Sequence, residues 1–299
     1  MAGVIVRPVT PEDDPAIREI SAAYDNLGSW PERPDFLDHE AATGRMYVAE
    51  DHEGAAVGFG GSFDRGDVVY LADLFIRPDV VGRGIGRALL ERILDRGTVH
   101  MTSASSDPRA LPLYARFGMR PLMPALYLRA PASRASVALA ADPDSRQAAA
   151  ATIAEIDAEI SGRARLPDHE FLQAARGAEG RVLQDGPRLA AYGWTRVVTV
   201  RGNAGPEARA YIAPAGARTP EAMDRMTRDL VVRAAQAVSD AATAAKCRVA
   251  DVSLLVLGPH PTLPALLAGG FRIVDRDTFM CSRVDLIDGR RYAHSPELG

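Results

Sequence analysis

The feature that most constrains the fold is the stretch from Val68 to Leu94, which reads VVYLADLFIRPDVVGRGIGRALLERIL. An apolar run ends at Pro78, a glycine-rich turn follows over residues 82–86, and apolar residues then recur at helical spacing. The order is strand, turn, helix. The first-turn amides of a helix have no intrahelical acceptor, and the helix dipole adds partial positive charge there. Because glycines leave these amides uncovered, the turn is predicted to bind an anion, best a phosphate or pyrophosphate.

The spacing of the glycines narrows the choice of ligand. Gly82, Gly84 and Gly86 alternate, so they do not form the dinucleotide pattern G-x-G-x-x-G, and no Gly-Lys-Ser/Thr ends the turn as in a P-loop. The order resembles the acetyl-coenzyme A signature Q/R-x-x-G-x-G/A of the GNAT superfamily of N-acetyltransferases. Gly84 and Gly86 fill its glycine positions, and Val81 stands where the family usually has Gln or Arg. A glycine-rich turn without a ligand is the alternative.

A second segment, SSDPRALPLYARFGMRP over residues 105–121, resembles the family motif N-x-x-A-x-x-L-Y-x-x-x-G-F. Asp107 lies near the Asn position, Leu113 and Tyr114 form the Leu-Tyr pair, and Gly118-Met119 replaces Gly-Phe. The resemblance implies that Tyr114 lies beside the thioester sulfur. A phenol with a pKa near 10 is neutral at pH 7 and can protonate the departing thiolate. Tyr114 is therefore the predicted general acid, and a packed tyrosine with its hydroxyl in solvent is the alternative.

Asp73 is the candidate general base. An acceptor amine must lose a proton before it attacks, because an ammonium group with a pKa near 10 has no lone pair. Some relatives use a carboxylate on this strand, and strand alternation places Asp73 and Phe75 on one face. A salt-bridged or edge aspartate, with a water chain as the base, is the alternative. Direct transfer is expected, through a tetrahedral intermediate whose oxyanion meets a backbone N–H such as that of Leu74.

The resemblance also implies where the cofactor and the acceptor bind. The strands at 67–76 and 99–104 are expected to run parallel and splay, so that the pantetheine arm enters the gap. The segment over residues 25–40 is expected to form an acidic, aromatic lip over the acceptor, suited to a cationic amine; a solvated surface with locally packed Trp30 is the alternative. The predicted cofactor-binding residues are Leu74, Phe75, Ile76, Val81, Gly82, Arg83, Gly84, Ile85, Gly86, Arg87, Asp107 and Tyr114, the predicted substrate-binding residues are Trp30 and Asp25, and no metal ligand is predicted.

Composition sets the broad class. The chain has 299 residues, of which 47% are hydrophobic, enough for one or two domains. A net charge of −4 favours neither nucleic acid nor an anionic membrane as a partner. Cys247 and Cys281 have no metal-ligand spacing and are expected to be free thiols. No apolar run approaches the roughly 20 residues that span a bilayer, so a cytoplasmic protein is expected, as a monomer or homodimer.

The second half is predicted to repeat the first. Residues 1–130 are expected to form the catalytic GNAT domain, 131–136 a linker and 137–299 a degenerate copy. At a constant offset of 152 residues, Leu111-Pro112 matches Leu263-Pro264 and Gly118 matches Gly270. Leu266 then replaces Tyr114, and the counterpart of the glycine turn, residues 214–220, has no G-x-G and contains two prolines. The second copy is therefore expected to have lost the chemistry.

Several element boundaries follow from the same patterns. In the first half, a strand is expected over 3–9, a helix from Thr10 through about residue 27, and later strands over 46–50, 56–63, 67–76, 99–104 and 125–129. In the second half, a strand is expected over 137–141, a long helix capped by Asp142-Pro143, strands over 181–183, 189–200, 208–212 and 252–257, and a helix over 223–238. Arg163, Arg165, Asp168 and His169 gather in one segment, either as an anion or substrate site or as a salt-bridged, helix-capping turn.

The predicted fold is α/β (α+β), with two tandem GNAT-like domains, each a mixed, mostly antiparallel central sheet flanked by helices. The resemblance implies an N-acetyltransferase that moves an acetyl group from acetyl-CoA to a primary amine of a small molecule or peptide. Two alternatives stay open. One is a non-catalytic acyl-CoA sensor or scaffold protein, and the other is transfer of another acyl group or to a non-amine acceptor.

Overall fold

The computed structural model describes residues 4–135, 139–175, 177–202, 205–247 and 249–299. The elements of the first half are β1 (Ile5–Pro8), a 3-10 turn (Pro11–Asp13), α1 (Asp14–Ala22), α2 (Phe36–Thr43), β2 (Arg45–Glu50), β3 (Ala56–Arg65), β4 (Val68–Ile76), a 3-10 turn (Pro78–Val80), α3 (Ile85–Ile93), β5 (Val99–Ala104), α4 (Ala110–Arg116) and β6 (Arg120–Pro131). Those of the second half are α5 (Ala132–Ala135), β7 (Ser145–Gln147), α6 (Ala150–Ser161), α7 (Leu166–Ala174), β8 (Glu179–Asp185), β9 (Arg188–Gly202), β10 (Gly205–Ala217), α8 (Pro220–Ala245), β11 (Val249–Leu257), α9 (Leu263–Ala268), β12 (Arg272–Cys281) and β13 (Tyr292–Ala293).

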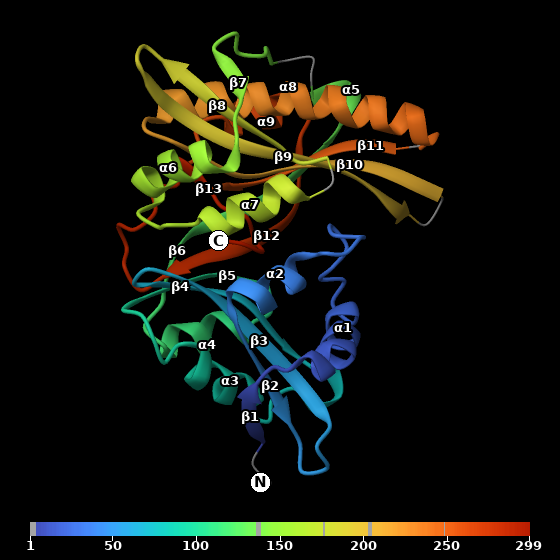
Figure 1. Ribbon diagram of the computed structural model, residues 1–299, viewed down its shortest axis with the longest axis vertical. Helices are drawn as coiled ribbons and strands as arrows, with labels where there is room; N and C mark the ends of the chain where they lie inside the picture. Colours follow the sequence, from blue (N-terminus) through green and yellow to red (C-terminus); the bar gives the residue numbers. More distant parts are fainter. Residues whose placement is uncertain (1–3, 136–138, 176, 203–204, 248) are drawn as a thin grey trace.

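These strands form one mixed sheet that runs through both halves. Their order is β1-β2-β3-β4-β5-β12-β6-β11-β10-β9-β8-β7, with β13 beside β10. Most neighbours are antiparallel, and the described parallel pairs are β4 with β5 and β10 with β11. Figure 1 shows the two halves stacked, with α2 and α7 facing each other between them and the long helix α8 along the outer side of the second half. The predicted fold class is confirmed.

The first half begins with the antiparallel meander that the hairpin signals predict. β2 pairs with β3 and β3 with β4, and the turns between them carry Gly54 at φ 80° and Gly66 at φ 70°. Positive φ is open to glycine at no steric cost, which is why these positions end the strands. Ala72 is the extra residue of a bulge in β4, because Gly61 pairs with Asp73 and the next residue, Ser62, pairs with Leu71.

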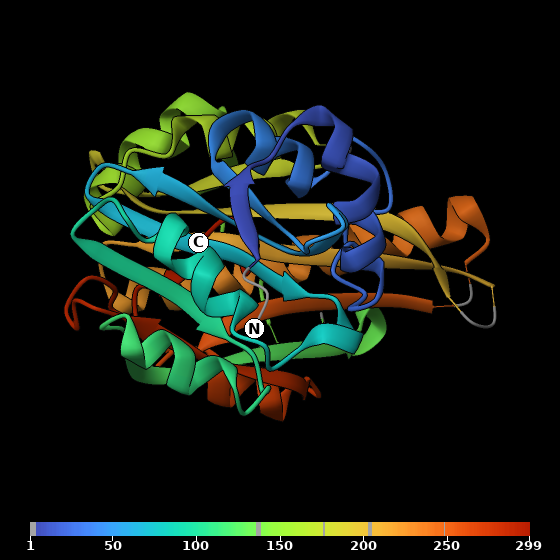
Figure 2. The same ribbon diagram turned by 90° about the horizontal axis from the view of Figure 1, so that it is seen from below.

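The two halves exchange one strand each. β12, from the end of the chain, pairs with β5 on one side and β6 on the other. β6, from the first half, in turn lies between β12 and β11. Figure 2, the view from below, shows the strands of both halves continuing across the molecule. The central strands therefore depend on both halves for their hydrogen bonds.

The segment predicted as a linker takes part in this arrangement. Pro131 ends β6, and residues 132–135 form the short helix α5. The side chains of Ala132 and Ala135 are buried against the core below α8. Residue 136 lies outside the described residues. The small side chains that suggest a flexible connection instead allow close packing against a helix.

Three predicted boundaries were wrong because tertiary contacts use the same residues differently. The first helix ends at Ala22, and residues 23–29 form turns, with Asp25 at φ 52°. No strand is present over 139–141 (residues 137 and 138 lie outside the described residues), and the helix predicted from Asp142 begins at Ala150. The side chain of Asp142 binds Arg225 at 2.8 and 3.1 Å, and its amide donates to Asp229, so it caps no helix.

The core has three parts. One lies under α3 and α4 of the first half and includes Leu89 and Leu90. A second lies under α8. The third lies between the halves and joins Phe59 and Phe63 to Trp194. None of the helices in the described ranges combines the length and the apolar character needed to cross a membrane.

Candidate cofactor and transfer site

The glycine turn forms an open cradle at the start of α3. Gly84 is the N-cap at φ 85°, and Gly82 has φ 87°. A Cβ added at either glycine would meet nothing within 4 Å, so the space in front of the turn is free. Within the described chain, the amides of residues 81–87 have no hydrogen-bond acceptor, and the first amide that has one is Ala88, bonded to the Gly84 carbonyl. The arrangement can receive an anion with several oxygens.

Strands β4 and β5 separate next to this cradle. Their parallel pairing runs from Val68 with Val99 to Tyr70 with Met101 and then stops, although β4 continues to Ile76. Beyond that point the Leu71 carbonyl accepts from Thr102 Oγ1 at 2.9 Å, and the Ile76 carbonyl accepts from the Tyr24 hydroxyl at 2.6 Å. The edge of β4 that faces β5 is therefore unpaired by strand hydrogen bonds over Leu74 and Phe75, where an extended ligand could add as a strand.

Tyr114 projects from α4 into the core beside the gap. It is 8% exposed, and its hydroxyl has no hydrogen-bond partner among the described residues. Burial raises its pKa, and the negative charges of Asp107, Asp277 and Asp73 raise it further. The phenol is therefore neutral at physiological pH and has a proton to donate.

Asp73 lies on the opposite face of the sheet, between the two halves. It is 2% exposed; Oδ1 accepts from Asn26 Nδ2 at 3.1 Å, whereas Oδ2 has no donor among the described residues. Burial raises the pKa of Asp73 to about 6. Phe75, on the same face, packs its ring 5.7 Å from that of Phe59. At neutral pH this carboxyl is mostly ionised and can accept a proton.

Glu40 was not predicted as a site residue, although it lies next to Asp73. Its side chain, on α2, packs against Gly61, the cross-strand partner of Asp73, and is fully buried. Among the described residues, neither of its oxygens has a hydrogen-bond partner apart from the Asp73 carboxyl, and burial and the charge of Asp73 raise the pKa of Glu40 well above its usual value. The two carboxyls therefore share a proton. The sequence does carry a signal, because Phe36 and Glu40 are four residues apart on the apolar face of one helix.

A second carboxyl that was not predicted comes from the other half of the chain. Asp277, on β12, accepts from the Tyr127 hydroxyl at 2.8 Å. Burial raises its pKa to about 6, and its charge acts on Tyr114. No motif marks Asp277, because only the strand exchange brings β12 next to β5.

The remaining predicted residues are not all brought together. Trp30 is 6% exposed and is stacked on Phe171 at 5.2 Å, on the inner side of the α1–α2 segment. Asp25 is exposed and does not line either of the two cavities beside Trp30. Asp107 binds the side chain of the neighbouring Arg109, while Arg87 pairs with Glu91 at 2.9 Å on the exposed face of α3, and Arg83 is exposed on the glycine turn.

In the second half, the corresponding gap is filled by the chain itself. The pairing of β10 with β11 ends at Ile212 with Leu254, and β13 then pairs with β10, Ala293 opposite Ala215. Thr219 is the N-cap of helix α8, and its Oγ1 accepts from the Ala222 amide at 3.2 Å. Leu266, at the position of Tyr114, is fully buried. The described part of this half therefore has no open cradle at the position that corresponds to the glycine turn.

The polar cluster of the second half is a buried network of ion pairs. Asp157 binds Arg165 Nε at 2.9 Å and His169 Nε2 at 3.0 Å, and the Trp194 indole donates to His169 Nδ1 at 3.1 Å. All are nearly fully buried, which favours the salt-bridged alternative for this segment. Within the described ranges, no three His, Cys, Asp or Glu side chains are placed to hold a metal ion.

Comparison with known proteins agrees with this geometry. Residues 15–119 match the model of the acetyltransferase (GNAT) family. A protein of Pyrococcus horikoshii described as a "putative acetyltransferase" is 15% identical and has a TM-score of 0.69, over 100% of this chain and 97% of that one. A tandem GNAT protein from the clavulanic acid biosynthesis pathway is 17% identical, with a TM-score of 0.57 over 93% and 98% of the two chains.

A third solved structure, a GCN5-related N-acetyltransferase from Sphaerobacter thermophilus, is 16% identical, with a TM-score of 0.54 over 99% and 98% of the two chains. No curated protein sequence gives a significant match. At these sequence identities the solved structures establish only the fold, and the family model shows to which family residues 15–119 belong. Residues 15–119 therefore form a domain that matches the acetyltransferase (GNAT) family, and the whole chain has the fold of solved GNAT proteins, one of them a tandem protein.

Proposed function

We propose that the protein transfers an acetyl group from acetyl-CoA to a primary amine of a small molecule or peptide, and that the first half carries the reaction. The observation on which the proposal rests is the open, glycine-bounded N-terminus of α3 beside the point where β4 and β5 separate. The cofactor supplies an activated acetyl thioester. The amides of residues 81–87 fit its diphosphate, and the free edge of β4 at Leu74 fits its amide-bearing arm.

The chain's own groups can supply the two proton transfers. Asp73, sharing a proton with Glu40, accepts the proton of the incoming ammonium group. The neutral hydroxyl of Tyr114 donates a proton to the departing thiolate sulfur. The C–N bond would form first and the C–S bond would break second, and an amide N–H of β4 would stabilise the oxyanion that exists between these two events. Asp277 and Glu297 from the second half add negative charge on the acceptor side.

The placement of the diphosphate is tested by Gly84→Asp. The substitution puts a carboxylate into the cradle, so coenzyme A affinity should fall at least about tenfold, or roughly 1.4 kcal/mol. Gly54→Asp is the matched control, because Gly54 also has positive φ (80°) and open space within 4 Å but lies in the β2–β3 turn. Calorimetry should show weakened binding for Gly84→Asp alone. Equal affinity of a folded Gly84→Asp protein would contradict the placement.

A further inference from the structure

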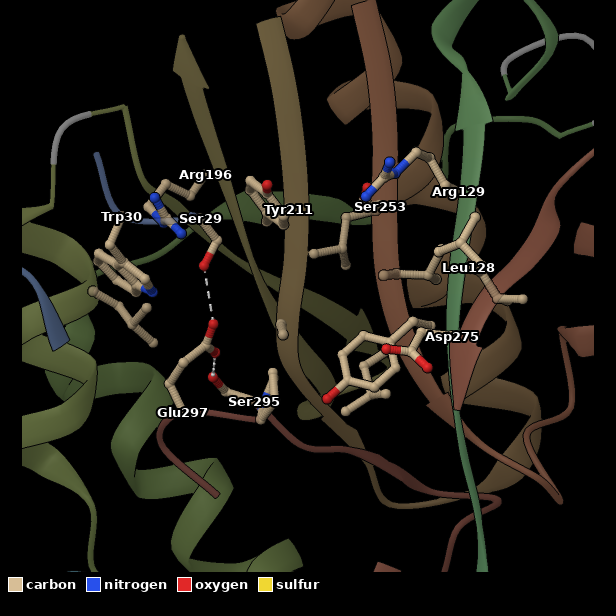
Figure 3. Close-up of a pocket in the computed structure, with 18 residues that line it drawn as sticks. Ser29, Trp30, Leu128, Arg129, Arg196, Tyr211, Ser253, Asp275, Ser295 and Glu297 are labelled. Atoms are coloured by element: carbon tan, nitrogen blue, oxygen red, sulfur yellow. Dashed lines mark hydrogen bonds between the residues drawn. The ribbon is translucent and has the colours of Figure 1, made fainter. Parts of the chain in front are cut away.

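A cavity between the two halves contains none of the residues to which the proposed function assigns a proton transfer. Its volume is about 260 Å³, and its walls come from the α1–α2 segment, from β6, β9, β10, β11 and β12, and from residues 295–297 (Figure 3). Trp30 and Arg196 separate it from a second hollow of about 400 Å³. A volume of this size suits a small molecule.

Arg196, on β9, is the cationic group at one end of the cavity. It is 7% exposed, and its guanidinium carbon lies 3.6 Å from the centre of the Trp30 ring and 5.3 Å from that of Tyr211. Stacking of this kind uses the face of the guanidinium. The five N–H bonds point outward in its plane, and within the described chain Arg196 makes no hydrogen bond or ion pair. The cation therefore lacks an acceptor in its plane.

Other donors around the same cavity also lack partners. Ser253 Oγ, Arg129 Nε and Trp30 Nε1 are each buried and have no hydrogen-bond partner among the residues that the structure describes. Buried polar groups without partners are uncommon in folded proteins, and each one costs about 1–3 kcal/mol. Four unpartnered donor groups around one cavity indicate an acceptor that is not part of the chain. In Figure 3, Arg196 and the pair of Ser253 and Arg129 lie along the upper side of the view.

The opposite side of the cavity is acidic. Glu297 is held in place by Ser29 at 3.1 Å and by Ser295 at 2.8 Å, and Asp275 lies at the exposed end (Figure 3). Neither carboxylate forms an ion pair with Arg196. Burial lowers the pKa of Arg196, yet arginine stays charged at neutral pH. The cavity therefore has a cationic side rich in free donors and an anionic side.

We infer that this cavity binds a small organic carboxylate that also carries an amino group. The two carboxylate oxygens accept in-plane N–H groups of Arg196, with Ser253 and Arg129 as further donors, because a guanidinium fork matches a carboxylate. Glu297 attracts the ammonium group. A multiply charged phosphate fits less well, since Glu297 and Asp275 would repel it. Such a molecule could be the acceptor of the transfer or a separate ligand, and the experiment distinguishes the two.

The test is calorimetry on the full-length protein with free amino acids, each compared with its decarboxylated amine and its des-amino acid. At least one amino acid should bind, and its decarboxylated amine should bind at least about tenfold more weakly. Arg196→Gln and the smaller change Ser253→Ala should both weaken binding. Arg201→Gln, on the same strand but exposed, is the matched control and should not. Thermal unfolding of each variant reports whether it is folded.

Mass spectrometry after addition of acetyl-CoA shows whether the bound amino acid is the acceptor of the transfer or a separate ligand. A bound amino acid that becomes acetylated is the acceptor, and one that stays unmodified is a separate ligand; both outcomes support the site. The inference is overturned if no member of the panel binds at millimolar concentration, or if binding is the same in folded Arg196→Gln and Ser253→Ala. Coenzyme A affinity is measured on the same samples and should be unchanged, so failure to bind coenzyme A would refute the proposed function separately.

Discussion

At the scale of single residues, the proposed chemistry depends on how burial changes proton affinity. Burial favours the neutral form of an acid, so it raises the pKa of Tyr114, Asp73 and Glu40 alike. The charge at neutral pH depends on the pKa that each group has before burial. Tyr114 stays protonated throughout the physiological range, whereas Asp73, with a pKa of about 6, changes charge just below it.

Tyr114→Phe should lower kcat about 100-fold or more, because the thiolate would leave without a proton donor. Coenzyme A affinity should stay the same, since the hydroxyl bonds to no other described residue and the ring remains. Stopped-assay kinetics with calorimetry on the same protein checks both values. A non-catalytic scaffold would show no difference in any measured property, which would reject Tyr114 as the acid.

The rate should depend on pH through Asp73. The ionised fraction of Asp73 rises as pH increases through about 6, so kcat/KM should rise over this range and then level off. Asp73→Asn should remove this rise from the pH–rate profile and lower the rate about 100-fold.

Glu40, when protonated, donates to Asp73 and lowers the pKa of Asp73. Glu40→Met should therefore move the rise in kcat/KM to higher pH. Glu40→Gln keeps a donor and should leave the rise nearly in place. A rise that does not move in Glu40→Met would contradict the pairing of Glu40 with Asp73.

At the scale of elements, equivalent segments in the two halves have different roles. In the first half, β4 and β5 separate and leave a gap beside an open helix N-terminus. In the second half, β13 occupies the gap between β10 and β11, and Thr219 and Pro220 occupy the start of α8. The same strand-helix geometry is therefore open at the proposed ligand site in one copy and is filled by a piece of the chain in the other.

The binding stoichiometry should consequently be one coenzyme A per chain. Calorimetry of the intact protein gives this number directly, and Gly84→Asp should weaken the whole isotherm rather than half of it. Thr219→Ala, which removes the cap of α8, serves as the control and should leave the isotherm unchanged. Two equivalents of coenzyme A would show that the second half also binds the cofactor.

At the scale of the whole molecule, the two halves are held together by exchanged strands and by buried charge. β6 and β12 each pair with strands of the other half. Asp168, in the second half, accepts from His39 Nε2 at 2.8 Å and from Arg65 Nε at 3.0 Å, both in the first. Because the halves share strands, we expect them to unfold in one transition.

Asp168→Asn should destabilise the protein by about 3 kcal/mol, since Arg65, 7% exposed, would keep a buried charge without its counterion. Denaturant unfolding measures this, with Asp144→Ala at the exposed pair with Arg225 as the control. Burial alone would raise the pKa of Asp168, but the hydrogen bonds from His39 and Arg65 lower it to about 2. Its stabilising contribution is thus present above the unfolded pKa of about 4 and is lost as pH falls toward 2. A difference between the two proteins that does not shrink in acid would contradict this account.

The sequence by itself determined the parts that depend on local order. The strand-turn-helix of residues 68–94, the hairpin glycines and the repeat of Leu111-Pro112 at Leu263-Pro264 follow from spacing and backbone freedom, which act within a few residues. The fold class and the family were predicted from these patterns. Only the tertiary structure decided that Glu40 lies beside Asp73, that Asp277 reaches the first half, and that Arg196 faces Glu297 across a cavity. These groups are far apart in the chain. The packing of α2 on the strands of the first half brings Glu40 to Asp73, and the exchanged strand β12 brings Asp277 to the first half.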